Sequence, residues 1–159
     1  MESFKKILFP IDLSEASRLV APYVNMMVDQ FRAESHIIHV VHFTDYYSSL
    51  EEPIPSVKGY VSEITHWVEG KVQQFIDENM SPTPVATKLI VGRPGEEILD
   101  YAKSEGIDLI VMAHSQTRIG RLVFGSVASN VVKGAPMPTM IVNPNMLKGK
   151  VKKTETVRA

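Results

Sequence analysis

The chain alternates between short apolar runs and longer segments in which apolar residues recur every three or four positions. Continuous apolar runs indicate strands covered on both faces of a sheet, whereas the longer period indicates amphipathic helices. Strands are expected at residues 7–11, 37–41, 85–91, 109–112 and 139–142, of which the first and fourth are wholly apolar. Four helical segments separate them, and Ser14, Pro94 and the pair Gly125-Ser126 are suitable starts for the first, third and fourth.

Strands that alternate with helices predict an α/β fold: a doubly wound, five-stranded parallel sheet with helices on both faces. Lys88 within the third strand and Pro138 at the start of the fifth are typical of sheet edges. With right-handed crossovers, the simplest strand order is then 3-2-1-4-5. In that order the winding reverses between the first and fourth strands, so we expect a crevice at their carboxyl ends, after Pro10 and Met112.

One domain is expected at residues 1–145, followed by a basic tail at residues 146–159. A chain of 159 residues is long enough to bury a single core. The tail has no apolar period, so we expect it to be mobile and solvated. The polar loop at residues 44–56 is compatible with either a lid or a surface for a partner protein, and its residues do not decide between the two.

Composition argues against several classes of protein. The formal net charge of −1 is unlike that of a dedicated nucleic-acid binder. Because cysteine is absent, disulfides and thiolate metal sites are excluded, and a cytosolic location is expected. The first apolar run is too short for a signal peptide or a membrane span, so no membrane partner is expected. The histidines are scattered along the chain and suggest no metal site.

Two groups of residues are expected to face the crevice. Asp12 directly follows the first strand, where it either contacts a ligand or forms the turn into the helix. After the fourth strand a small polar loop leads to Gly125 and Ser126, whose N–H groups and hydroxyl could hold a phosphate. The same serine could instead be an ordinary N-cap. His114 either touches the ligand or supports the loop.

Six stretches, in this order and spacing, resemble the universal stress protein family from Lys5 to about Pro144. They are KKILFPIDLS at 5–14, IHVV at 38–41, VGRPGEEI at 91–98, DLIVMAH at 108–114, GSVA at 125–128 and PMPTMIV at 136–142. The resemblance implies an adenine-nucleotide alpha-hydrolase-like fold and a role in the stress response. It also implies a homodimer, in which the last strand, Met137 to Asn143, pairs across a two-fold axis. Such pairing would cover an edge strand that the monomer leaves open.

Members of this family that have a nucleotide pocket bind ATP or AMP through the pattern Gly-x2-Gly-x9-Gly-Ser. Carried over to this chain, the resemblance implies a nucleotide site whose first four residues lie beside adenine and ribose and whose remaining residues lie near the phosphates. These residues are Pro10, Ile11, Asp12 and Val40, then Met112, Ala113, His114, Ser115, Gly125, Ser126, Val127 and Ala128. Mg²⁺ would accompany ATP.

The chain keeps only part of that pattern. Ala113 replaces the first glycine, Ser115 or Gln116 replaces the second, and the loop is one residue shorter than the pattern. A side chain at the second position would hinder close backbone approach to a triphosphate. Arg118 and Arg121 could supply the missing positive charge, or they could be surface residues of the loop.

Three functions therefore stay open. The first is a regulatory, homodimeric module that binds an adenine nucleotide, with AMP affected less than ATP by the altered loop. The second is a protein-interaction module of the same fold without a nucleotide, which the loss of two glycines favours. The third is a slow ATPase or phosphotransferase. It ranks last because Asp12 is the only well-placed acid and no pair of carboxylates is available for Mg²⁺.

Overall fold

The structure, a computed structural model, describes residues 3–42, 57–114 and 125–145 of the 159-residue chain. Within these ranges the elements are β1 (Lys6–Pro10), α1 (Glu15–Phe31), β2 (Glu34–Val41), α3 (Val57–Asn79), β3 (Ala86–Val91), α4 (Pro94–Ser104), β4 (Leu109–Ala113), α5 (Ser126–Gly134) and β5 (Thr139–Val142). All neighbouring strands pair in parallel, in the order β3-β2-β1-β4-β5. The predicted fold class and strand order are confirmed.

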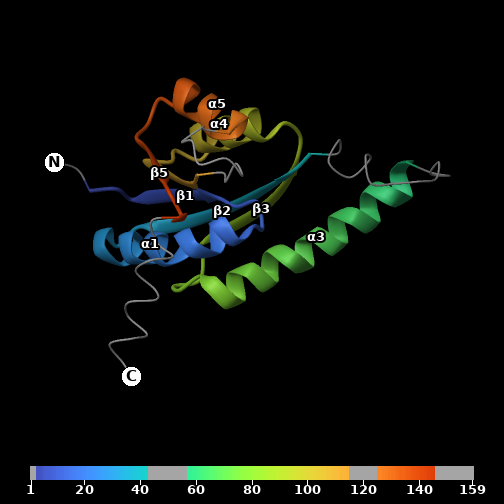
Figure 1. The fold of residues 1–159 in the computed structure, drawn as a ribbon, viewed down its shortest axis with the longest axis horizontal. Coiled ribbons are helices and arrows are strands. Elements are labelled where there is room, and N and C mark those ends of the chain that lie inside the picture. The colour runs from blue at the N-terminus through green and yellow to red at the C-terminus, as the bar shows by residue number, and fades with distance from the viewer. Residues whose placement is uncertain (1–2, 43–56, 115–124, 146–159) are drawn as a thin grey trace.

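The sheet is the middle layer of three (Figure 1). Helices α1 and α3 cover one face, and α4 and α5 cover the other. Side chains of β1 alternate between the two layers: Ile7 and Phe9 pack toward α1 and α3, and Leu8 packs toward α4 and α5. All three are fully buried. A central strand covered on both faces needs apolar residues at every position, which explains the continuous apolar run.

The start of α1 is capped as the sequence predicts. The Ser17 backbone N–H donates to the Ser14 hydroxyl at 3.4 Å, which satisfies one of the otherwise unpaired donors of the first turn. The second strand begins earlier than expected, at Glu34, because its first residues pair with β1 from Lys6 onward. Glu34, Ser35 and His36 are polar, so the apolar pattern could not reveal that part of the strand.

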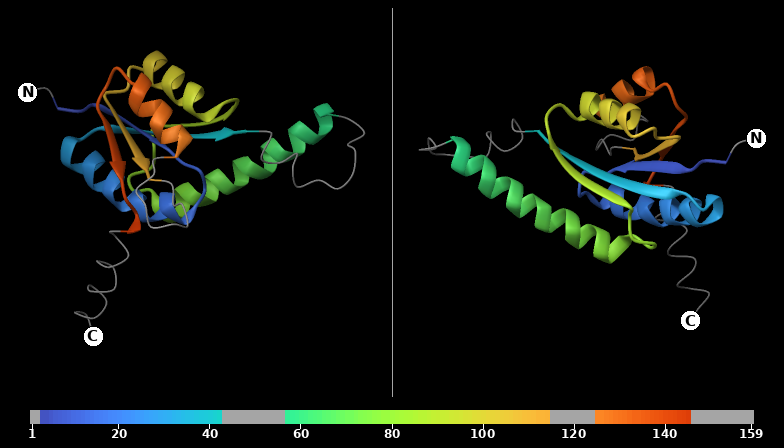
Figure 2. Two further views of the ribbon diagram at one scale, coloured as in Figure 1. Left: turned by 45° about the horizontal axis from the view of Figure 1, so that its top comes forward. Right: turned by 180° about the vertical axis from the view of Figure 1, so that it is seen from behind.

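Helix α3 is longer than the sheet that it covers. Its carboxyl-terminal half packs on the sheet through Val68, Val72 and Phe75, all buried. Figure 2 shows that its first turns extend beyond the carboxyl end of β2. The predicted loop at 44–56 and the predicted tail at 146–159 lie outside the described residues.

A buried histidine joins β2 to α4. The Nδ1 atom of His36 is hydrogen-bonded to the Tyr101 hydroxyl at 2.9 Å. Its Nε2 atom is also buried, has no hydrogen-bond partner among the described residues, and lies 4.0 Å from the Glu34 carboxylate. Burial lowers the pKa of His36, and the charge of Lys6 lowers it further, against the smaller opposing effects of Glu105 and Glu34.

We expect the domain to lose stability in mild acid partly through His36. Because the folded state disfavours the charged form, the unfolded chain binds the proton more readily, and stability falls as the pH drops below the ordinary histidine value of 6.5. A single group contributes at most about 1.4 kcal/mol per pH unit. Urea unfolding of wild type and His36→Gln, measured from about pH 7.5 to about pH 5, should show a shallower pH dependence in the variant.

The matched control is His66→Gln, because the His66 side chain on α3 is 93% exposed. This control should keep the wild-type pH dependence. If His36→Gln were as acid-sensitive as the wild type, groups other than His36 would carry the effect.

Candidate functional site

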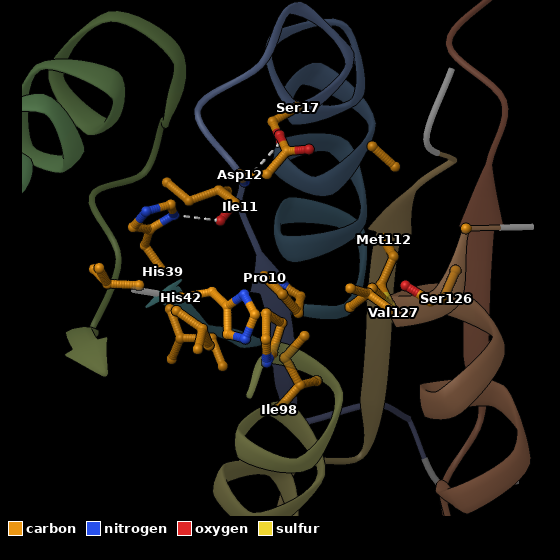
Figure 3. Close-up of a pocket in the computed structure, with 17 residues that line it drawn as sticks. Pro10, Ile11, Asp12, Ser17, His39, His42, Ile98, Met112, Ser126 and Val127 are labelled. Atoms are coloured by element: carbon orange, nitrogen blue, oxygen red, sulfur yellow. Dashed lines mark hydrogen bonds between the residues drawn. The ribbon is translucent and has the colours of Figure 1, made fainter. Parts of the chain in front are cut away.

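A cavity of about 440 Å³ opens at the carboxyl ends of β1, β2 and β4, at the reversal in winding where the sequence predicts a crevice (Figure 3). Its size is typical of small-molecule sites. Strand ends, the first turns of α1 and α4, and the start of α5 form its wall. The lining residues are Pro10, Ile11, Asp12, Ser17, Ile38, His39, Val40, Val41, His42, Pro94, Ile98, Met112, Ala113, Gly125, Ser126, Val127 and Ala128.

Of the predicted site residues that the structure describes, all but His114 line this cavity. His114 is buried and does not line the cavity, and its backbone N–H donates to the Val142 carbonyl at 2.8 Å, joining the ends of β4 and β5. Ser115 lies outside the described residues, together with Gln116, Arg118 and Arg121. The described structure therefore contains the start and the end of the predicted phosphate region but not the loop between them.

Asp12 is held in one orientation by Ser14, the N-cap of α1, and by Ser17 in the first turn of that helix. Its Oδ1 atom accepts hydrogen bonds from the Ser14 backbone N–H at 3.0 Å, from the Ser17 hydroxyl at 2.8 Å and from the Ser14 hydroxyl. Its Oδ2 atom makes no hydrogen bond to any described residue, and the side chain is exposed. Asp12 thus forms the turn with one oxygen, as one interpretation of its position predicts, and its carboxylate also lines the cavity.

The backbone beside Asp12 is strained. Leu13 has a φ of 62°, in the left-handed region that branched side chains rarely adopt. Such a conformation persists only where its surroundings enforce it, and it is frequent at ligand sites. Here the Ser14 and Ser17 contacts to Asp12 close the turn around Leu13.

His39 fixes the backbone that precedes Asp12. Its Nδ1 atom donates to the Ile11 carbonyl oxygen at 2.8 Å, because a carbonyl oxygen can only accept. On the other side, the Ile11 N–H donates to the Ile38 carbonyl at 2.9 Å. The strand exit is therefore anchored to β2 by two hydrogen bonds, which sets the position of the Asp12 carboxylate.

The opposite end of the cavity is the start of α5. Gly125 is the N-cap residue, and no side chain caps the helix, so Ser126 is its first residue rather than the ordinary N-cap that the sequence allowed. The backbone N–H groups of a first turn have no partner within the helix and carry the positive end of its dipole. Ser126 is exposed and lines the cavity, so this end suits an anion.

Several lining residues were not predicted. His39 and His42 were considered only as metal ligands, and Pro94 only as the first residue of a helix. Their positions at the carboxyl end of β2 and in the first turn of α4, both beside the predicted crevice, are the signal that could have identified them. Ser17, Ile38, Val41 and Ile98 complete this group.

The described lining combines an apolar wall with one carboxylate, Asp12, and one helix start, at Ser126. Its walls are mainly apolar, and Asp12 is its only carboxylate. Within the described ranges, no three histidine or acidic side chains gather closely enough to hold a metal ion. None of the helices in those ranges is both long enough and apolar enough to cross a membrane.

Comparison with known proteins gives the family. The model of the universal stress protein family matches residues 3–143. Universal stress protein MJ0577 of Methanocaldococcus jannaschii is 27% identical over 153 residues, which cover 87% of this chain and 94% of that protein. The solved structure of MJ0577 matches with a TM-score of 0.72 at 26% identity and covers 89% of this chain and 96% of its own.

Two more distant solved structures contain adenine nucleotides. A universal stress protein in complex with cAMP matches with a TM-score of 0.62 at 16% identity, covering 89% of this chain and 98% of its own. The universal stress protein from Archaeoglobus fulgidus in complex with dAMP matches with a TM-score of 0.55 at 19% identity, with the same two coverages. At these identities, the structural similarity shows a shared fold.

Proposed function

The chain belongs to the universal stress protein family, and we propose that its cavity binds an adenine nucleotide and that the protein is a regulatory binding module of the stress response. One observation carries the proposal: a single cavity has an oriented carboxylate, Asp12, in its middle and an uncapped helix start, at Ser126, at one end. Relatives of the same fold in complex with cAMP and dAMP support the choice of an adenine nucleotide.

The order of strands supports one orientation of the ligand. β1 lies between β2 and β4, so Asp12 stands between the β2 end of the cavity and the start of α5. A phosphate at Ser126 would receive hydrogen bonds from the first turn of α5. A ribose hydroxyl would donate to the Asp12 Oδ2 atom, and the base would then lie beside Val40 on β2.

A nucleoside monophosphate suits this cavity better than ATP with Mg²⁺. Mg²⁺ is usually held by one or two carboxylates together with phosphate oxygens. The described lining offers only Asp12, whose Oδ1 atom already accepts three hydrogen bonds. The described lining likewise offers Asp12 alone for the Mg²⁺ that an ATPase or phosphotransferase would use.

Thermal unfolding with and without AMP, ADP and ATP, each with and without Mg²⁺, tests the proposal. A ligand at one hundred times its dissociation constant stabilises the folded state by about 2.7 kcal/mol. For a domain of this size, the midpoint should rise by about 5–10 °C with AMP. The rise should be lost in Asp12→Ala. Protein free of bound nucleotide that shows no rise with any of the three would favour the interaction module without a nucleotide.

We also propose that the protein is a homodimer formed through residues 137–143. Strand β5 is an outer strand of the sheet, and Met140 on it is 44% exposed. An open edge with apolar side chains is suited to pairing with a second copy. Sedimentation at micromolar concentration should give twice the chain mass of 17.7 kDa. Met140→Lys should shift the protein toward the monomer, and a monomeric wild type would contradict the proposal.

A further inference from the structure

Helix α4 packs on one face of β2. At the end of this contact that is farther from the cavity, His36 is hydrogen-bonded to Tyr101, and both are buried. Alternate residues of β2 face α4, and Ile38, two positions after His36, belongs to the core on that side. At its other end, the contact between α4 and β2 borders the cavity.

His42 stands at the β2 end of the cavity. It lines the cavity together with Pro94 and Ile98 of α4, and it is half-buried. In Figure 3 its imidazole ring lies on the side of the cavity where Pro10 and Ile98 lie, away from Ser126. The neighbouring walls are apolar, so the imidazole is the aromatic surface that the described lining presents on the α4 side of β2.

His42 lies where the base of the proposed nucleotide would lie. A nucleotide is a linear arrangement of base, ribose and phosphate. If the phosphate binds at Ser126 and the ribose at Asp12, the base must extend toward β2, where His42 and the first turn of α4 line the cavity. Every base has an aromatic face, and stacking on an aromatic side chain contributes to affinity without requiring a particular pattern of hydrogen bonds.

We propose that His42 stacks on the base and makes the site select purine over pyrimidine nucleotides, an inference that rests on the proposed function. A purine presents two fused rings, so it covers more of the imidazole and of the apolar wall beside it than a single pyrimidine ring does. The selectivity follows from the area of contact, and His42 is therefore a specificity-determining residue of this chain.

The test is isothermal titration of AMP and CMP into wild type, His42→Phe, His42→Ala and His42→Gln. Loss of a stacking side chain weakens binding by about tenfold. We expect His42→Ala and His42→Gln to bind AMP about tenfold more weakly than wild type. Their affinity for CMP should change by about twofold or less. His42→Phe keeps an aromatic face and should bind AMP within about threefold of wild type. The control is His66→Ala, at an exposed position of α3, which should bind as wild type.

The two proposals fail in different ways. If His42→Ala bound AMP as tightly as wild type, or if His42→Phe bound it as weakly as His42→Ala, the stacking role would be wrong. A loss of AMP binding in Asp12→Ala would still support the nucleotide site in either case. If the wild type bound no nucleotide, both the nucleotide site and the stacking role of His42 would be wrong. If His42→Ala without ligand melts more than about 5 °C below wild type, its affinity for AMP would also reflect a loss of folding. The affinity of His42→Gln for AMP then tests the stacking role.

Discussion

Replacing Phe9 with alanine is expected to lower the free energy of unfolding by about 3–5 kcal/mol. Phe9 is in the middle layer, on the central strand β1, and none of its surface is exposed. Its ring packs against Phe75 of α3, with ring centroids 6.3 Å apart and the planes inclined by 55°. Alanine would leave a cavity between sheet and helix, because strand and helix are held by many other contacts and can close only part of the gap.

Urea unfolding at neutral pH measures this loss as a lower transition midpoint. The matched control is Phe31→Ala, because Phe31 is only half-buried and packs edge-to-face on Phe4 near the end of α1, with ring centroids 5.2 Å apart. The control should lose clearly less stability. Phe9→Leu, which keeps most of the volume, should fall between wild type and Phe9→Ala. Equal losses in Phe9→Ala and Phe31→Ala would contradict the central packing of Phe9.

Ser126→Glu is expected to abolish stabilisation by AMP while leaving the free protein as stable as before. A glutamate in the first turn of a helix interacts favourably with the helix dipole, so α5 itself should tolerate the change. The same carboxylate would occupy the end of the cavity proposed for the phosphate, where it would repel a second anion. The loss of about 2.7 kcal/mol of ligand-dependent stabilisation would remove a midpoint rise of about 5–10 °C.

The measurement is the thermal midpoint with and without AMP at one fixed concentration. Ser62→Glu introduces the same charge at an exposed position of α3 that does not line the cavity, and it should keep the wild-type rise. If Ser126→Glu responded to AMP as wild type does, the phosphate would not bind at α5. If Ser126→Glu unfolded at a much lower temperature without ligand, the α5 start would have a structural role instead.

The arrangement of the sheet could be predicted from the sequence because its determinants are local. Ile7, Leu8 and Phe9 form a continuous apolar run, as a strand covered on both faces requires. Lys88 and Pro138 indicated the two edges, and right-handed crossovers then left one simple order of strands, which the structure has. That order also predicted where the cavity opens, because it places the reversal in winding beside Asp12.

The side chains around the cavity could be predicted only in part. Asp12 and Ser126 are adjacent to ends of elements, so their positions follow from the positions of those elements. His114 is also adjacent to a strand end, yet it is buried beside β5 and does not line the cavity. A residue next to a strand end can turn toward the cavity or toward the neighbouring strand, and the sequence near it does not distinguish the two.

The sequence by itself determined the fold, the strand order and the edge of the sheet at which the cavity opens, since apolar periodicity and helix starts are properties of neighbouring residues. Only the tertiary structure decided which polar side chains are buried and what they contact. His36 binds Tyr101, 65 positions away, and His39 binds the Ile11 carbonyl, 28 positions away. A buried polar group needs a partner, and for these histidines the partner comes from another element, so their roles appear only once the elements are packed.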